Sequence, residues 1–228
     1  MPYSTILFDL DDTLYPSDNG LWDAIRWRMS LYMAERLGLS WDVIPAMRRT
    51  YYETYGTTLR GLQIHYQVDA DEYLDYVHDL PLETYLRPDP KLRAMLTGLP
   101  QQLWIFTNAD ADHAWRVLNI LEIQDCFQGI IDVRAIEFAC KPEPIAYQRA
   151  LALAGESDPF KCVFLDDSPL NLEIAHSLGL TTVLVGNHSS ADPWIDFHIP
   201  DTLALIHTMP ELWESEKTGS PAAGKSIS

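Results

Sequence analysis

Five short runs of apolar residues constrain the fold of this chain more than any other feature of its sequence. They cover residues 5–8, 102–106, 129–132, 162–165 and 181–185. Each run is continuously apolar rather than alternating, which is typical of strands in a parallel sheet covered on both faces. Helical patterns lie between the later runs, at 110–121, 143–154 and 168–178, and Gly155 and Gly179 follow the last two as stop signals. The sequence therefore predicts an α/β fold with a doubly wound parallel sheet.

Residues 16–88 interrupt this alternation, because they contain no convincing strand. A first helix is indicated by apolar and aromatic residues at helical spacing, namely Trp22, Ile25, Met29, Tyr32 and Met33. Gly38 ends that pattern. Asp69, followed three residues later by Glu72, forms an acidic version of a capping box and predicts a helix that runs through Leu80. We therefore expect a helical insertion after the first strand.

These patterns divide the chain into three parts. Residues 1–15 and 89–213 are expected to form the α/β core, and residues 16–88 an α-helical cap. Proline and glycine make the segments 16–20 and 87–90 natural hinges between the two. The tail, residues 214–228, is rich in Gly, Ser and Lys and is predicted to be disordered.

The charge balance narrows the possible partners. The chain of 228 residues has 16 basic and 33 acidic side chains, a net charge of −17. Such a chain is repelled by DNA, RNA and anionic membranes, so a polymeric nucleic acid is not expected as a partner. A bound metal ion and one lysine can reverse the potential locally, so small anionic substrates remain compatible with this charge.

The cysteine content and hydropathy indicate a cytoplasmic protein. Three cysteines (Cys126, Cys140 and Cys162) are too few and too irregularly spaced for a disulfide framework or a metal site of the CxxC type. No apolar run approaches the roughly 20 residues of a membrane span. The first residues lack the basic segment of a signal peptide. We therefore expect no membrane association.

Polar residues follow four of the predicted strands where those strands end. Taken singly, each has an ordinary explanation: a hinge turn, a turn signal, a surface lysine or a helix N-cap. Together they collect at one edge of the sheet, where ligands bind in open α/β folds. Carboxylates so close together repel one another unless a cation lies among them, and oxygen ligands favour Mg²⁺. The residues are Asp9, Asp11, Thr107, Asn108, Lys141, Asp166 and Asp167.

This set predicts the transfer of a phosphoryl group. Asp9, at the strand end, is the candidate nucleophile, and Asp11 the general acid and base. Thr107 and Lys141 are expected to hold the phosphoryl oxygens, with Asn108 beside them. The predicted metal ligands are Asp9, Asp167 and Asp11, the last through its backbone carbonyl. Asp166 and Asn171 are expected to support these ligands.

These motifs resemble those of the haloacid dehalogenase (HAD) superfamily, in the branch with a helical cap inserted after the first motif. The resemblance covers residues 4–207, and DLDDT at 9–13 matches the pattern DxDxT. Longer runs are similar to the pyrimidine 5′-nucleotidase group, at 11–22, 51–62, 65–79, 104–118 and 164–175. The resemblance implies a Rossmann-like core and a cytosolic, Mg²⁺-dependent phosphatase acting on nucleoside monophosphates such as UMP and CMP. Asn171 departs from the wider superfamily, in which many members have an acid at this position.

The cap is expected to supply substrate specificity, because the core contacts only the phosphoryl group. Tyr55, Thr58 and Arg60 could stack on a pyrimidine and bind its edge. Alternatively, the tyrosines form the cap's own core and Arg60 faces solvent. His113 either faces the site or lies on a helix surface, and His78 is expected to pair with acidic neighbours on its own helix.

Other functions remain open at this point. The same chemistry fits a phosphatase of sugar phosphates or other small phosphomonoesters, or a phosphomutase. A dehalogenase needs no acid for an alkoxide leaving group, so Asp11 argues against it. A binding protein without activity is disfavoured by the intact set of motif residues. The sequence assigns no oligomeric state and no base or sugar preference.

Overall fold

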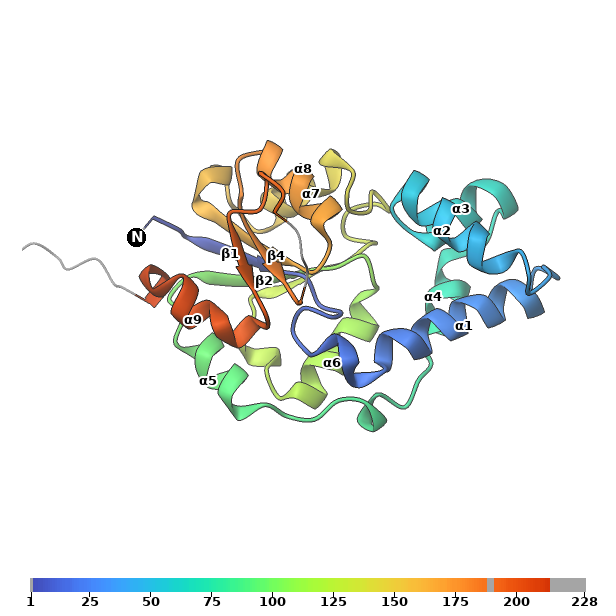
Figure 1. The fold of residues 1–228 in the computed structure, drawn as a ribbon, viewed down its shortest axis with the longest axis horizontal. Coiled ribbons are helices and arrows are strands. Elements are labelled where there is room, and N and C mark those ends of the chain that lie inside the picture. Colours follow the sequence, from blue (N-terminus) through green and yellow to red (C-terminus); the bar gives the residue numbers. More distant parts are fainter. Residues whose placement is uncertain (1, 188–190, 214–228) are drawn as a thin grey trace, which may run out of the picture.

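The protein is described here as a computed structural model that covers residues 2–187 and 191–213. Its core is a six-stranded sheet in which every neighbouring pair of strands is parallel, in the order β3-β2-β1-β4-β5-β6 (Figure 1). The predicted α/β architecture is therefore confirmed. The predicted disordered tail, residues 214–228, lies outside the described residues. The strands are β1 (Thr5–Phe8), β2 (Gln102–Phe106), β3 (Gly129–Ile131), β4 (Cys162–Asp166), β5 (Thr181–Val185) and β6 (Phe197–Ile199).

The sixth strand, β6, is a feature that the sequence analysis missed. It pairs with β5 in the register Val183↔Phe197 to Val185↔Ile199. It has only three residues, and His198 at its centre is exposed, so it shows no apolar run. The other five strands match the predicted runs, with ends that differ by at most one residue.

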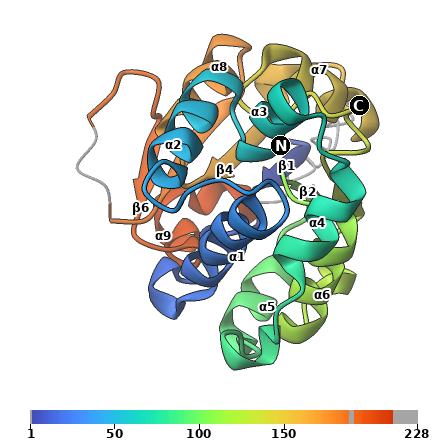
Figure 2. The ribbon, with the colours of Figure 1, turned by 90° about the vertical axis from the view of Figure 1, so that its right-hand side faces the viewer.

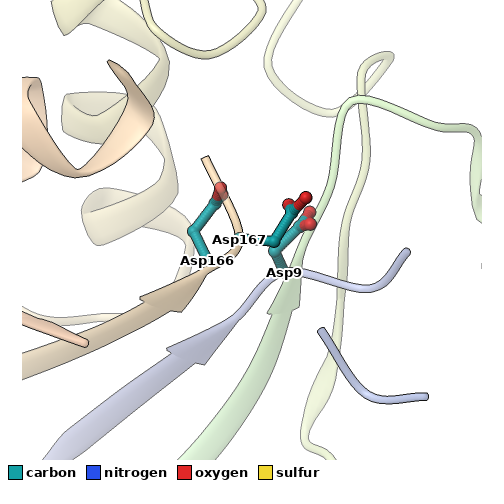
Figure 3. A group of neighbouring side chains, drawn as sticks. All are labelled: Asp9, Asp166 and Asp167. Carbon is teal, nitrogen blue, oxygen red and sulfur yellow. The ribbon is translucent and has the colours of Figure 1, made fainter. Parts of the chain in front are cut away.

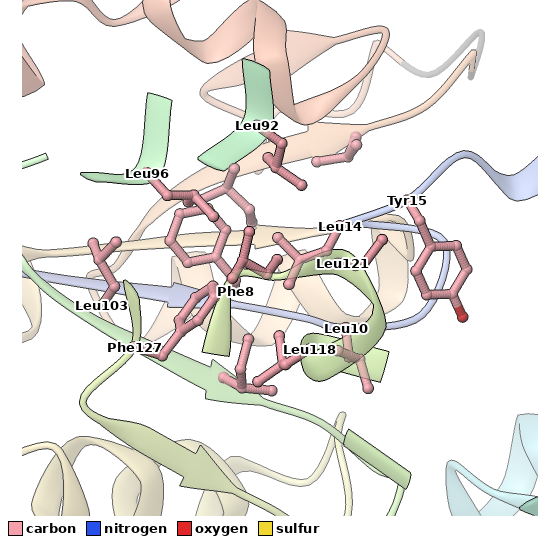
Figure 4. Close-up of a cluster of buried hydrophobic side chains, with 14 of the residues drawn as sticks. Phe8, Leu10, Leu14, Tyr15, Leu92, Leu96, Leu103, Leu118, Leu121 and Phe127 are labelled. Carbon is pink, nitrogen blue, oxygen red and sulfur yellow. The ribbon is translucent and has the colours of Figure 1, made fainter. Parts of the chain in front are cut away.

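Both faces of the sheet are covered by helices, which explains the continuous apolar runs. Ile6 and Phe8 of β1 pack in one cluster with helices α5, α6 and α9, whereas Leu7 packs on the opposite face with α7 and α8. Figure 4 shows the first cluster, in which Phe8 meets the ring of Phe127 edge-on at 5.8 Å. The helices of the core are α5 (Pro90–Thr97), α6 (Ala111–Leu121), α7 (Pro144–Leu153), α8 (Pro169–Ser177) and α9 (Leu205–Thr208).

Four further helices stand beside the sheet, over the carboxyl ends of its strands (Figures 1 and 2). They have a hydrophobic cluster of their own, which includes Tyr32, Met33, Leu62 and Tyr73. The N-cap of α4 is as predicted, since the Asp69 carboxylate accepts a hydrogen bond from the Glu72 amide at 2.9 Å. The helices are α1 (Leu21–Glu35), α2 (Ile44–Tyr55), α3 (Thr58–Tyr66) and α4 (Ala70–His78). Among the described helices, none has the length and apolarity needed to cross a membrane.

The start of α1 and the segment after α4, where the helical insertion begins and ends, pack against the core. Leu21 and Ile25, in the first turns of α1, belong to the same cluster as Phe8. Leu82 and Leu86, after α4, belong to it as well. The base of the helical insertion therefore packs on the same core as the sheet.

Candidate active site

Three carboxylates converge where two neighbouring strands end (Figure 3). Asp9 directly follows β1. Asp166 is the last residue of β4, and Asp167 comes directly after it. The strands are paired so that the Asp9 amide donates to the Leu165 carbonyl at 2.9 Å. One oxygen of each carboxylate lies within 4.8 Å of the others. The parallel pairing predicted from the sequence thus brings these three side chains together.

A buried lysine lies between two of these carboxylates. The Lys141 ammonium donates to Asp9 Oδ1 and to Asp166 Oδ2, both at 2.7 Å, and to the Phe106 carbonyl at 2.9 Å. These three bonds use all three of its donors. The rings of Phe106 and Phe164 flank it at 5.1 and 5.2 Å, and the residue is 1% exposed. A buried charge is tolerated here because it is fully paired.

Asn108, which follows β2 together with Thr107, holds the main chain of Lys141 in place. The Asn108 side chain donates to the Lys141 carbonyl at 3.0 Å and accepts from the Lys141 amide at 2.8 Å. Asn108 therefore binds the main chain next to the lysine. The buried Thr107 hydroxyl accepts from the Ala109 amide at 3.0 Å, which leaves its own proton free to donate to a ligand.

The charges of this cluster fit a divalent cation. Burial raises the pKa of Asp9 and of Asp167, and the neighbouring Asp166 raises both further, although Lys141 opposes this. Three carboxylates against one ammonium leave an excess of two negative charges. An all-oxygen donor set of this charge suits Mg²⁺. Asp9, Asp166 and Asp167 are therefore the residues that could hold the ion.

Asp166 is the most tightly held of the three carboxylates. Its Oδ1 accepts from the Ser168 amide at 2.8 Å and from the Asn171 side chain at 2.9 Å, while Lys141 binds its other oxygen. It has no exposed surface. Asn171 therefore supports Asp166, and the predicted role of both residues beside the metal ligands stays a prediction. The amide of Asn171 donates a hydrogen bond here, which a carboxylic acid at this position could do only when protonated.

Asp11 is not part of this carboxylate cluster and binds other partners. Its Oδ1 accepts from the Tyr15 hydroxyl at 2.5 Å and lies 3.0 Å from His113 Nε2. Burial alone would raise the pKa of Asp11, but His113 and Tyr15 outweigh it and lower the pKa below its ordinary value. The carboxylate is therefore ionised and held by one oxygen. Its assignment as a metal ligand through the backbone carbonyl stays a prediction.

The turn between α2 and α3 lies directly against Lys141. The Cys140 thiol donates to the Tyr55 carbonyl at 3.4 Å and lies 3.7 Å from the Thr57 hydroxyl. Next to Asp167, the Tyr52 hydroxyl is 3.2 Å from the Ser168 hydroxyl. The helical insertion thus contacts the core both beside Lys141 and beside Asp167.

The three predicted substrate-binding residues of the cap surround this turn. Tyr55 is half-buried, and its hydroxyl lies 2.9 Å from His65 Nε2. Thr58 is buried at the start of α3, and Arg60 is half-buried on the same helix. Their role in binding a substrate stays a prediction.

Gly56 makes the close approach of this turn possible. Its φ is +80°, and a Cβ at this position would lie 2.6 Å from the Lys141 carbonyl oxygen. We expect Gly56→Ala to lower the free energy of unfolding by about 2–4 kcal/mol, because left-handed backbone strain and a steric clash add. Gly38→Ala is the matched control, since Gly38 has a φ of +66° and no atom within 4 Å of such a Cβ. It should lose only about 1–2 kcal/mol. Equal losses in urea unfolding would contradict the close packing of the turn on Lys141.

The structure shows the partners of two histidines whose surroundings the sequence did not decide. His113 is buried and faces Asp11, which selects the first of its two interpretations. The expectation for His78 was wrong: its Nδ1 lies 2.5 Å from Asp110, the N-cap of α6, and not against acidic neighbours on its own helix. Sequence reasoning also missed Tyr15, Tyr52 and Cys140. Only Tyr15 carried a local signal, four residues after Asp11.

The chain is similar to known proteins in both sequence and fold. Residues 3–179 match the family of haloacid dehalogenase-like hydrolases. Phosphate metabolism protein 8 of Saccharomyces cerevisiae is 35% identical over 191 residues, which span 78% of this chain but only 60% of the yeast protein. The fold resembles that of the magnesium-bound HAD-hydrolase YfnB from Bacillus subtilis, with a TM-score of 0.63, 16% identity, and 91% and 98% of the two chains covered. It also resembles a HAD phosphatase from Thermococcus onnurineus, with a TM-score of 0.61, 20% identity, and 90% and 96% covered. The chain therefore belongs to the family of haloacid dehalogenase-like hydrolases.

Proposed function

We propose that this hydrolase is a Mg²⁺-dependent phosphatase of small phosphomonoesters, in which Asp9 is the nucleophile. The observation that carries the proposal is the placement of Asp9: it lies in a cluster with Asp166 and Asp167, and Lys141 binds one of its oxygens. The name of the yeast relative, Phosphate metabolism protein 8, is consistent with this chemistry.

The reaction takes place in two displacements. The free oxygen of Asp9 attacks phosphorus, the bond from phosphorus to the leaving oxygen breaks, and Asp11 gives that oxygen a proton. Water then attacks the phosphorus of the aspartyl phosphate and gives a proton to Asp11, which releases inorganic phosphate and restores Asp9. Bound Mg²⁺ would neutralise charge on the phosphoryl oxygens.

Thr107 and Lys141 would stabilise the charge that develops during each displacement. Thr107 would do so through its free hydroxyl proton, whereas Lys141, whose three donors are already used, would act through its positive charge. The lowered pKa of Asp11 favours the ionised form, which accepts the proton of the attacking water. Asp11 must bind a proton before it can serve the leaving group.

For the substrate, we propose nucleoside 5′-monophosphates, with UMP and CMP preferred. The proposal rests on the resemblance of the long runs quoted above and on the aromatic and polar residues around the α2–α3 turn. Tyr55 would stack on the base, and Thr58 and Arg60 would bind its edge.

The test is phosphate release in the presence of Mg²⁺ from UMP, CMP, dUMP, dTMP, AMP, GMP and several sugar phosphates. We expect release from nucleotides, with pyrimidines preferred, and none after removal of Mg²⁺ with EDTA. A profile that favours sugar phosphates would keep the phosphatase and overturn the nucleotide. Phosphoryl return to a substrate hydroxyl, without net release, would indicate a phosphomutase and contradict the proposal.

A further inference from the structure

A series of buried contacts leads from the helical insertion to Asp11. It begins at His78 in the last turn of α4, whose Nδ1 lies 2.5 Å from Asp110 Oδ2. Both side chains are less than one tenth exposed. The other Asp110 oxygen caps α6 by accepting from the His113 amide at 2.9 Å. Asp110 thus joins α4 to the start of α6.

The rings of His78 and His113 are also stacked. Their centroids are 4.2 Å apart and their planes differ by 17°. His113 has no exposed side-chain surface, and its Nε2 lies 3.0 Å from Asp11 Oδ1. A proton on Nε2 makes His113 the donor of this contact with the Asp11 oxygen. Within the described residues, the opposite nitrogen, Nδ1, has no partner.

Two donors therefore hold the same oxygen of Asp11. Tyr15 and His113 both bind Oδ1, which leaves Oδ2 for the reacting proton. The end of α4 is fixed by Arg116, which donates to the carbonyls of His78 at 2.9 Å and Leu80 at 2.5 Å. The position of the His78 ring over His113 thus depends on α4 being docked against α6.

We propose that His78 and His113 are positioning residues that make the proton transfers of Asp11 depend on docking of the helical insertion. With α4 docked, His78 covers one face of the His113 ring, and His113 orients the Asp11 carboxylate. When α4 moves away, this support is lost and the carboxylate can rotate. The inference rests on the proposed phosphatase function and assigns to these two residues a part in it.

Variants of His113 test the inference through the leaving group. His113→Leu removes the donor to Asp11, whereas His113→Gln keeps a donor near the position of Nε2. Release of p-nitrophenolate needs no proton, but release of uridine from UMP does.

We expect His113→Leu to lower kcat for UMP about 30-fold with little change in KM, as a partial loss of general acid–base catalysis. The first turnover of p-nitrophenyl phosphate, followed as a burst of p-nitrophenolate, should stay within about threefold of the unmodified protein. His113→Gln should recover most of the UMP activity. An equal loss with both substrates, or no loss, would overturn the inference.

Variants of His78 test the part played by the helical insertion. His78→Leu should lower kcat for UMP about 10-fold, and His78→Asn, which keeps a donor near the position of Nδ1, should recover it. His207→Leu, at an exposed position of α9, is the control and should change neither rate. Full activity of His78→Leu would overturn the role of the insertion. If the unmodified protein hydrolyses neither compound, the proposed function itself fails.

Discussion

Asp9→Asn is expected to abolish turnover while the protein stays folded. The substitution removes the attacking oxygen but keeps the size of the side chain, and its amide oxygen can still accept the bond from Lys141. Loss of a nucleophile lowers kcat by about four orders of magnitude or more. The free energy of unfolding should change by no more than about 1 kcal/mol, because one repelling charge in the cluster is lost together with one partner of Lys141.

Phosphate release and urea unfolding, measured side by side, check this result. Asp75→Asn makes the same chemical change at an exposed position of α4 and should keep full activity. Loss of the nucleophile should leave far less than about a tenth of the activity. If Asp9→Asn retained more than that, another group would have to attack phosphorus.

Lys141→Met is expected to give the largest loss of stability among single substitutions in the site. Methionine keeps the length of the side chain and its contacts with Phe106 and Phe164 but removes the charge. Asp9 and Asp166 are then buried without a cation, and breaking a buried ion pair costs about 3–5 kcal/mol. Urea unfolding in EDTA should show this loss.

A second substitution and the pH dependence separate this cause from a simple packing defect. Adding Asp166→Asn to Lys141→Met should recover part of the loss, because one of the two unpaired charges is removed. Burial already raises the pKa of Asp9 with Lys141 present, and losing the ammonium raises it further. A folded state that binds more protons than the unfolded state becomes less stable as pH rises, so the deficit should be smaller at pH 5 than at pH 8. The ion-pair explanation would be contradicted if the loss of stability were the same with and without Asp166→Asn and the same at pH 5 and pH 8.

The sheet and the motif residues were predictable because they depend on local patterns. A continuous apolar run such as 162–165 indicates a strand buried on both faces, and parallel strands bring their carboxyl ends to one edge. That geometry alone brings Asp9, Asp166 and Asp167 together. Lys141 was assigned to the site for the same reason, because it follows the third strand.

The rest depends on contacts between distant parts of the chain. His78 meets Asp110 only because α4 docks on α6, and an acidic helix offered nearer partners in the sequence. The close packing of Gly56 was not predicted, since nothing local indicates that the Lys141 carbonyl lies against it. The strand β6 was missed because three residues with an exposed centre resemble a loop.

The most direct test of the account is to trap the phosphorylated carboxylate. The protein is mixed with UMP and Mg²⁺, quenched within a single turnover, reduced with borohydride and digested for peptide mass analysis. Borohydride converts an aspartyl phosphate to homoserine, so the account predicts homoserine at position 9 and only when substrate is present. Phosphate release accompanied by homoserine at another aspartate, or by none, would contradict Asp9 as the nucleophile.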